Sequence, residues 1–144
     1  MLSTTSQYAL RALTELAGIP GGEAMLGRDL AELADIPANY LSKVMLAMRN
    51  AGLVTTARGS GGGYRLLKSP DEIHLIEVVG IFDAPQVKPI CLLGKGDCSD
   101  RDPCSAHTLW RDVRSAYIQF LETTTLADIA SAPKALTVEE SQQP

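Results

Sequence analysis

A glycine-rich segment flanked by arginines constrains the fold of this chain most strongly. Residues 59–63 contain four glycines and one serine, with Arg58 before them and Arg65 shortly after. The stretches 53–57 and 64–67 on either side have strand-like composition, so we expect a β-hairpin with a glycine-rich loop. Glycine lets the backbone approach a groove closely, and the two arginines can enter a minor groove or bind phosphates. A nucleotide-phosphate loop is disfavoured, because it needs a Lys-Ser/Thr ending and a helix that opens directly afterwards.

Three helical patterns precede this hairpin. Apolar residues recur at helical spacing over residues 2–16, a short helix is expected at 28–34, and a third helix is expected at 38–50, with Pro37 as its first residue. A short helix, a tight turn and a longer helix have the proportions of a helix-turn-helix. The sequence therefore predicts a mainly α fold with a small β-wing, in which residues 1–83 form a winged helix-turn-helix DNA-binding domain.

The outward side of the third expected helix carries hydrogen-bonding and cationic groups that can contact bases and phosphates. A solvated helix face would look similar, and only the adjoining hairpin favours DNA. The net charge of −4 argues against nucleic acid, but residues 1–70 carry seven Lys and Arg against five acids. The residues expected to contact double-stranded DNA are Arg28, Ala38, Asn39, Tyr40, Ser42, Lys43, Arg49, Arg58, Gly59, Ser60, Gly61, Gly62, Gly63, Tyr64 and Arg65.

All three cysteines and one of the two histidines lie within 17 positions: Cys91, Cys98, Cys104 and His107. Thiolates and imidazole are ligands for iron–sulfur clusters and for zinc, and they suit Mg²⁺ or Ca²⁺ poorly. Structural zinc prefers shorter gaps between paired cysteines than the six and five residues found here, so an iron–sulfur cluster is favoured over zinc and over plain redox thiols. We expect residues 84–104 to form the cluster loop.

A long amphipathic helix is expected to begin just after Cys104 and to end near residues 123–125. A winged domain already has its own core, so the apolar stripe of this helix is expected to pack on a second copy of the chain. The expected dimer contacts are Trp110, Val113, Tyr117, Phe120 and Leu121. A short helix should complete residues 105–131, and residues 132–144 are expected to form a flexible tail. The cluster is expected between the winged domain and the dimer helix.

The remaining composition narrows the class of protein. No apolar run is long enough for a membrane span, and the N-terminus does not resemble a secretory signal. Three cysteines cannot form a closed disulfide framework, so reduced thiols and a cytoplasmic location are expected. There is no nucleophile–base pair and no nucleotide motif, so an enzyme is not expected. A small iron–sulfur electron carrier would leave the glycine-rich hairpin unexplained.

Several segments together resemble the Rrf-type winged-helix regulators over about residues 2–131. They are Ser3-Thr-Thr-Ser-Gln-Tyr8-Ala-Leu-Arg-Ala-Leu, Asn50-Ala-Gly-Leu-Val, Arg58-Gly-Ser-Gly-Gly-Gly-Tyr-Arg-Leu and Cys104-Ser-Ala-His107-Thr-Leu-Trp110-Arg-Asp. The resemblance implies a homodimeric transcription regulator whose DNA binding depends on an iron–sulfur cluster, and which responds to iron–sulfur status, redox state or NO.

The resemblance also implies a ligand set. IscR-like members hold a [2Fe-2S] cluster with three cysteines and a histidine, which correspond here to Cys91, Cys98, Cys104 and His107. NsrR-like repressors hold a [4Fe-4S] cluster with an acidic residue near the N-terminus, and Gln7 stands at the corresponding place in this chain. The [2Fe-2S] cluster with His107 as fourth ligand is therefore favoured, with the [4Fe-4S] repressor and a zinc-stabilised DNA-binding module as alternatives.

Overall fold

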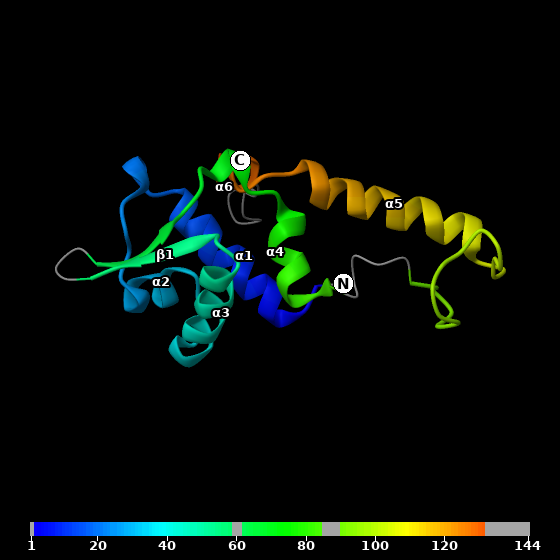
Figure 1. Cartoon of the computed structure of the whole chain (residues 1–144), viewed down its shortest axis with the longest axis horizontal. Coiled ribbons are helices and arrows are strands. Elements are labelled where there is room, and N and C mark those ends of the chain that lie inside the picture. The colour runs from blue at the N-terminus through cyan, green and yellow to red at the C-terminus, as the bar shows by residue number, and fades with distance from the viewer. Residues whose placement is uncertain (1, 59–61, 85–89, 132–144) are drawn as a thin grey trace, which may run out of the picture.

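The structure is a computed structural model that describes residues 2–58, 62–84 and 90–131. It is mainly helical with one small antiparallel sheet, which confirms the expected fold class (Figure 1). Within these ranges, none of the helices has the length and apolar character needed to cross a bilayer. The elements in order are α1 (Thr4–Ala17), η1 (Pro20–Gly22), α2 (Gly27–Leu33), α3 (Ala38–Asn50), β1 (Val54–Ala57), β2 (Gly63–Leu66), η2 (Pro70–Glu72), α4 (Leu75–Phe82), α5 (His107–Thr123) and α6 (Leu126–Ser131).

Helix α1 lies at the centre of the molecule and contacts α2, α3, α4 and α6. It begins after Ser3, whose hydroxyl accepts a 3.1 Å hydrogen bond from the Ser6 amide, as is typical of an N-cap serine. Its inner face is fully buried at Ala9, Ala12 and Leu13. The two alanines are small, so the neighbouring helices can approach the α1 backbone closely, and the core forms around this helix.

Helices α2 and α3 form the helix-turn-helix. Asp35 lies in the turn between them with φ of 53°, a left-handed conformation that aspartate tolerates better than most residues. Helix α3 spans the expected residues 38–50, although Pro37 is its N-cap and not its first residue, and it buries Leu41, Val44, Met45 and Met48 as expected. Its opposite side remains exposed to solvent.

The wing is a two-stranded hairpin with a third segment paired to its edge. Strands β1 and β2 pair antiparallel, with Thr55 opposite Arg65. Met25 and Tyr64 exchange both backbone hydrogen bonds, at 2.9 and 2.8 Å. Gly63 next to this pair has φ of 129°, and a Cβ atom there would lie 2.0 Å from the Met25 carbonyl oxygen. Glycine at position 63 is therefore required for the wing to close on the segment before α2.

Helix α5 extends away from the winged domain, and the cysteine segment lies at its far end (Figure 1). The expectation that this segment lies between the winged domain and the dimer helix is therefore wrong. The C-terminal half of α5 packs against the winged domain. There, Leu121 is 1% exposed and belongs to the same core as residues of α4 and α6. The helix is long enough to carry the cysteine segment clear of the wing.

The apolar side chains of α5 divide into two faces. Leu121 is buried and Tyr117 packs against the core of the chain itself, whereas Val113 and Phe120 are 61% and 52% exposed. Leu109, which the sequence argument did not include, is 79% exposed on the same side as Val113. The expectation that Leu121 contacts the partner in a dimer is therefore wrong. Leu121 adjoins Phe120 in the sequence, but successive residues of a helix point about 100° apart, and Leu121 faces the core of its own chain.

Candidate metal centre and nucleic-acid interface

The segment before α5 folds into a tight loop around Cys91. Ile90 and Asp97 form a bridge, and the Cys91 amide donates a 2.9 Å hydrogen bond to the Gly96 carbonyl. Gly94 and Gly96 have φ of 72° and 100°, so glycine at both positions permits the chain to turn back on itself. These turns bring Cys91 and Cys98, which are separated by six residues in the sequence, to the same end of α5.

The four expected ligands meet in two pairs. The Sγ atoms of Cys91 and Cys104 lie 3.6 Å apart, and Cys98 Sγ lies 3.3 Å from His107 Nδ1. All four side chains line one cavity of about 140 Å³, together with charged residues such as Lys95 and Asp102. The structure therefore brings together all four side chains that the sequence suggested as metal ligands.

The backbone around Cys91 favours the ligand form of its sulfur. Backbone N–H groups of Lys95 and Leu93 direct hydrogen bonds to the sulfur and, together with a contact from Cys104, lower the pKa of the Cys91 thiol despite its burial. A thiolate is the form that binds metals, and hydrogen bonds to cysteine sulfur tune the potential of iron–sulfur centres. The loop thus presents a sulfur ligand that fits such a cluster, with Cys91 itself only 7% exposed.

The arrangement in pairs bears on the kind of metal group that fits. Among residues 2–58, 62–84 and 90–131, no three His, Cys, Asp or Glu side chains converge on a point that could hold a single metal ion. A structural zinc needs four ligands around one point, whereas each iron of a [2Fe-2S] cluster takes two protein ligands. Two pairs of candidate ligands on one cavity are the number and grouping that a two-iron cluster takes.

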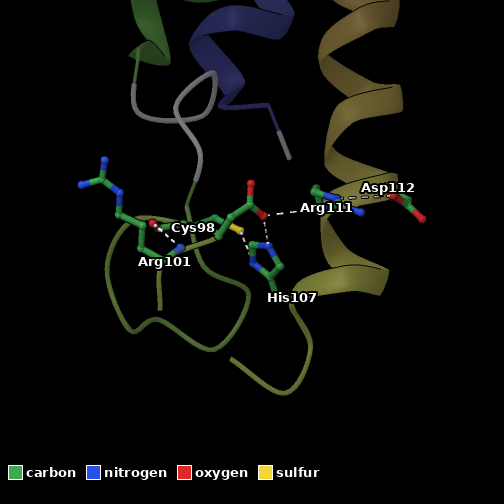
Figure 2. A network of polar contacts seen from close by, with 7 residues as sticks. Cys98, Arg101, His107, Arg111 and Asp112 are labelled. Carbon is green, nitrogen blue, oxygen red and sulfur yellow. Dashed lines mark hydrogen bonds and ion pairs between the residues drawn. The ribbon is translucent and has the colours of Figure 1, made fainter. Parts of the chain in front are cut away.

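His107 links this cavity to α5. It is the first residue of the helix, and its amide donates a 3.0 Å hydrogen bond to the Cys104 carbonyl. Its Nε2 atom lies 2.7 Å from Asp100 Oδ1, and Arg111 Nη1 lies 3.6 Å from the same oxygen (Figure 2). The hydrogen bond with His107, and then the charges of His107 and Arg111, lower the pKa of the Asp100 carboxyl. Asp100 was not predicted from the sequence. It lies in a loop, and a separation of seven residues there does not indicate that its side chain contacts His107.

The solvent-exposed side of α3 carries the polar residues expected from the sequence. Asn39, Tyr40, Ser42, Lys43 and Arg49 are exposed, and Ala38 is exposed at the helix start. Arg28 on α2 has an 85% exposed side chain, and Arg58 and Arg65 are exposed on the wing. The expected contacts Gly59, Ser60 and Gly61 lie outside the described residues.

Two residues of α1 extend this surface, and the sequence argument did not include them. The Tyr8 ring packs edge-on against Tyr40, with centroids 5.9 Å apart. Arg11 lies 4.9 Å from the Tyr8 centroid, and Lys43 Nζ lies 5.8 Å from the Tyr40 centroid. Cations at these distances are attracted to the ring faces. The paired tyrosines therefore have one cation each at their rings, Arg11 on α1 and Lys43 on α3.

A helix-turn-helix with an exposed polar recognition helix, followed by an arginine-bearing wing, defines a winged-helix DNA-binding protein. The chain matches the Rrf2 family, described as iron-dependent transcriptional regulators, over residues 2–132. It belongs to this family. It is a DNA-binding transcription regulator and not an enzyme.

The relatives are regulators of the same kind. The chain is 33% identical to the HTH-type transcriptional regulator IscR of Vibrio vulnificus strain YJ016 over 141 residues, covering 98% of this chain and 83% of that one. IscR of Cronobacter sakazakii is also 33% identical, covering 98% and 86%. Among solved structures, CymR, the global cysteine regulator of B. subtilis, superposes with a TM-score of 0.76 at 31% identity, covering 91% and 96%. The T. potens IscR structure superposes with a TM-score of 0.72 at 24% identity, covering 100% and 92%, and supports the fold.

Proposed function

We propose that the chain is a homodimeric regulator that senses iron–sulfur status, redox state or NO through a [2Fe-2S] cluster. The ligands would be Cys91, Cys98, Cys104 and His107. One observation carries the proposal. In the described part of the chain, these four side chains lie as two close pairs that line a single cavity. Bound there, the cluster would supply an iron centre that reacts with oxidants and NO and would cross-link residues 91–107.

The relatives support the cluster, and the ligand set favours the two-iron form. Curated relatives that are 33% identical to this chain over nearly its whole length carry the name IscR. A [4Fe-4S] cluster of the NsrR kind would take an acidic ligand from near the N-terminus. Gln7 stands there instead, is exposed, and donates its amide to the Leu2 carbonyl at 3.3 Å. His107, whose Nδ1 already faces the cavity, is the fourth ligand in this proposal.

The dimer would form through the exposed apolar side of α5. Leu109, Val113 and Phe120 are four and seven residues apart, which places them on one side of the helix, with Trp110 and Tyr117 at its edge. A two-fold dimer would bring two copies of this side together and present two α3 helices to successive major grooves, about one helical turn apart. The winged domains and the cysteine loops would then be attached to opposite ends of the same paired helices.

This connection explains how the state of the cysteine loop would reach the DNA. His107 is both a proposed ligand and the first residue of α5, so a change in the loop acts directly on the N-terminal end of that helix. The other end of α5 is fixed in the winged domain by Leu121. A shift of the paired α5 helices would change the separation of the two α3 helices, which changes the relative stability of the DNA-bound states.

The test is selection of DNA from a library of random duplexes. We would use anaerobically purified protein, the same protein after iron removal with a chelator, and the variants Lys43→Ala and Arg58→Ala. Specific sites should be enriched, with affinity at least about a thousandfold above bulk DNA. Loaded and iron-free protein should differ in site choice or affinity.

A matched control removes a charge at the other end of the molecule. Arg101→Ala loses an exposed cation in the cysteine loop and should bind the selected DNA like wild type. Equal binding by Lys43→Ala, Arg58→Ala and wild type would contradict the assigned surface. Identical site choice and affinity with and without iron would contradict sensing, and would leave a DNA-binding protein with a structural metal.

A further inference from the structure

Asp100 makes a contact on the side of the His107 ring that faces away from the cavity. Its Oδ1 atom lies 2.7 Å from His107 Nε2, whereas Nδ1 on the other side of the ring lies 3.3 Å from Cys98 Sγ. Figure 2 shows the dashed contact from the His107 ring to Cys98, with Arg111 nearby on α5. The ring is thus held between a sulfur and a carboxylate.

The burial of the two partners differs sharply. The His107 side chain is 10% exposed, and the Asp100 side chain is 79% exposed. Arg111, one turn further along α5, lies 3.6 Å from the same Asp100 oxygen, so the carboxylate is attached to the helix that carries His107. Asp100 therefore closes the solvent side of a ring that is otherwise enclosed.

A carboxylate can only accept hydrogen bonds, and a neutral imidazole carries its hydrogen on one nitrogen. A hydrogen bond to Asp100 requires that Nε2 carry this hydrogen, which leaves the Nδ1 lone pair free toward the cavity. Carboxylates behind metal-binding histidines fix the ring and its tautomer in this way in many metal sites, and their loss costs about 10–100-fold in metal affinity or activity.

We propose that Asp100 is a positioning residue that makes Nδ1 of His107 the metal-ligating atom. The inference rests on the proposed function, because it assigns a role to Asp100 in the ligation of the same cluster. Arg111 holds the carboxylate in place. The anion behind the ring also favours the more positive, oxidised form of a centre ligated by His107.

The first experiment compares Asp100→Ala, Asp100→Asn and Asp112→Ala in the full-length, anaerobically purified protein. Asp112 is the matched control: it is an exposed acid 3.8 Å from Arg111 and makes no contact with His107. We expect the loss of iron to a chelator to be about 10–100-fold faster in Asp100→Ala than in wild type. The reduction potential should become more positive, and the nitrogen hyperfine coupling from ¹⁵N-histidine should change. Asp100→Asn keeps an acceptor oxygen, so it should restore the hyperfine coupling while its potential stays raised.

The second experiment uses iron-free protein, so that it remains informative if no cluster binds. The chain has two histidines, and His74→Gln identifies the His107 signals in ¹⁵N-correlated NMR. Wild type should show the tautomer with hydrogen on Nε2, and Asp100→Ala should show a mixture. The inference would be overturned if Asp100→Ala and Asp112→Ala showed the same rate of iron loss, reduction potential, hyperfine coupling and His107 tautomer. Wild type could also bind no iron and still show a fixed His107 tautomer. That result would refute the proposed function and, with it, the role of Nδ1 as a metal ligand.

Discussion

The indole Nε1 of Trp110 donates a 2.8 Å hydrogen bond to the backbone carbonyl of Ile90. Ile90 directly precedes Cys91 and pairs with Asp97, which directly precedes Cys98. One side chain from the first turn of α5 therefore anchors the start of the cysteine loop near two of the proposed ligands. The loop and the proposed dimer helix are connected at Trp110 as well as at His107.

Trp110→Phe should loosen this loop while keeping an aromatic ring on α5. A lost hydrogen bond of this kind costs about 0.5–1.5 kcal/mol, which corresponds to roughly two- to tenfold faster iron loss to a chelator. Tyr117→Phe is the control, because the Tyr117 hydroxyl is buried and has no hydrogen-bond partner in the described part of the chain. Iron loss at the wild-type rate in both variants would show that the Trp110 contact does not hold the loop.

Gly63→Ala should destabilise the wing. A residue forced into φ of 129° is strained, and the added methyl would meet the Met25 carbonyl oxygen at 2.0 Å. We expect a loss of about 1–3 kcal/mol in the free energy of unfolding, together with weaker DNA binding. Gly80→Ala in α4 meets nothing within 4 Å and should be neutral or gain about 0.5–1 kcal/mol. Urea unfolding of both variants measures the difference, and equal stabilities would contradict the geometry of the wing.

Asp83 should make the stability of the iron-free protein depend on pH in the acid range. Its buried carboxylate accepts hydrogen bonds from the Ser3 amide and hydroxyl, at 3.0 and 2.9 Å. Burial raises the pKa of Asp83, but the hydrogen-bonding groups of Ser6 and Ser3 outweigh burial and lower it below its usual value. A lowered pKa means that the stabilisation is complete above about pH 4 and is lost as the pH falls through the folded-state value.

Asp83→Asn tests this directly. At pH 7 it should lose about 1–3 kcal/mol of unfolding free energy, because a hydrogen-bonded charge at the start of α1 is removed. As the pH falls below about 4, wild type should progressively lose this advantage, so that the difference between the two proteins shrinks. Urea unfolding at pH 7 and at pH 3 gives the comparison. A difference that stays constant with pH would show that Asp83 does not contribute through its charge.

Val113→Glu should disrupt the proposed dimer. Val113 lies in the middle of the exposed apolar side of α5, and a charge there would face its symmetry copy. Ser115→Glu adds the same charge on another exposed side of α5 and should leave the dimer intact. Light scattering after size-exclusion chromatography should give a monomer for the first variant and a dimer for the second. A dimer in both would place the interface elsewhere.

The sequence was sufficient for the elements whose signals are local. Helix α3 was predicted with its bounds because Pro37 and Gly52 mark its ends and its apolar face is regular. The wing was predicted because glycines and arginines stand between two strand-like stretches. Met25, which pairs with Tyr64, was not predicted, because nothing near Met25 in the sequence indicates a strand.

The features that depend on tertiary contacts were not predictable in the same way. The apolar residues of α5 formed one stripe in the sequence, and only the packing of Leu121 against α4 and α6 separates its buried face from its exposed one. The four proposed metal ligands were chosen from residue type and spacing. Their pairing, and the place of Asp100 behind His107, depend on how the loop turns at Gly94 and Gly96.

Iron and sulfide analysis, with EPR after reduction, on anaerobically purified wild type and His107→Ala determines whether the cysteine loop holds a [2Fe-2S] cluster. We expect about two irons and two sulfides per subunit, an EPR signal of a reduced [2Fe-2S] centre, and an altered or lost cluster in the variant. About four irons per subunit with His107→Ala fully loaded, or colourless protein with stoichiometric zinc, would contradict this expectation.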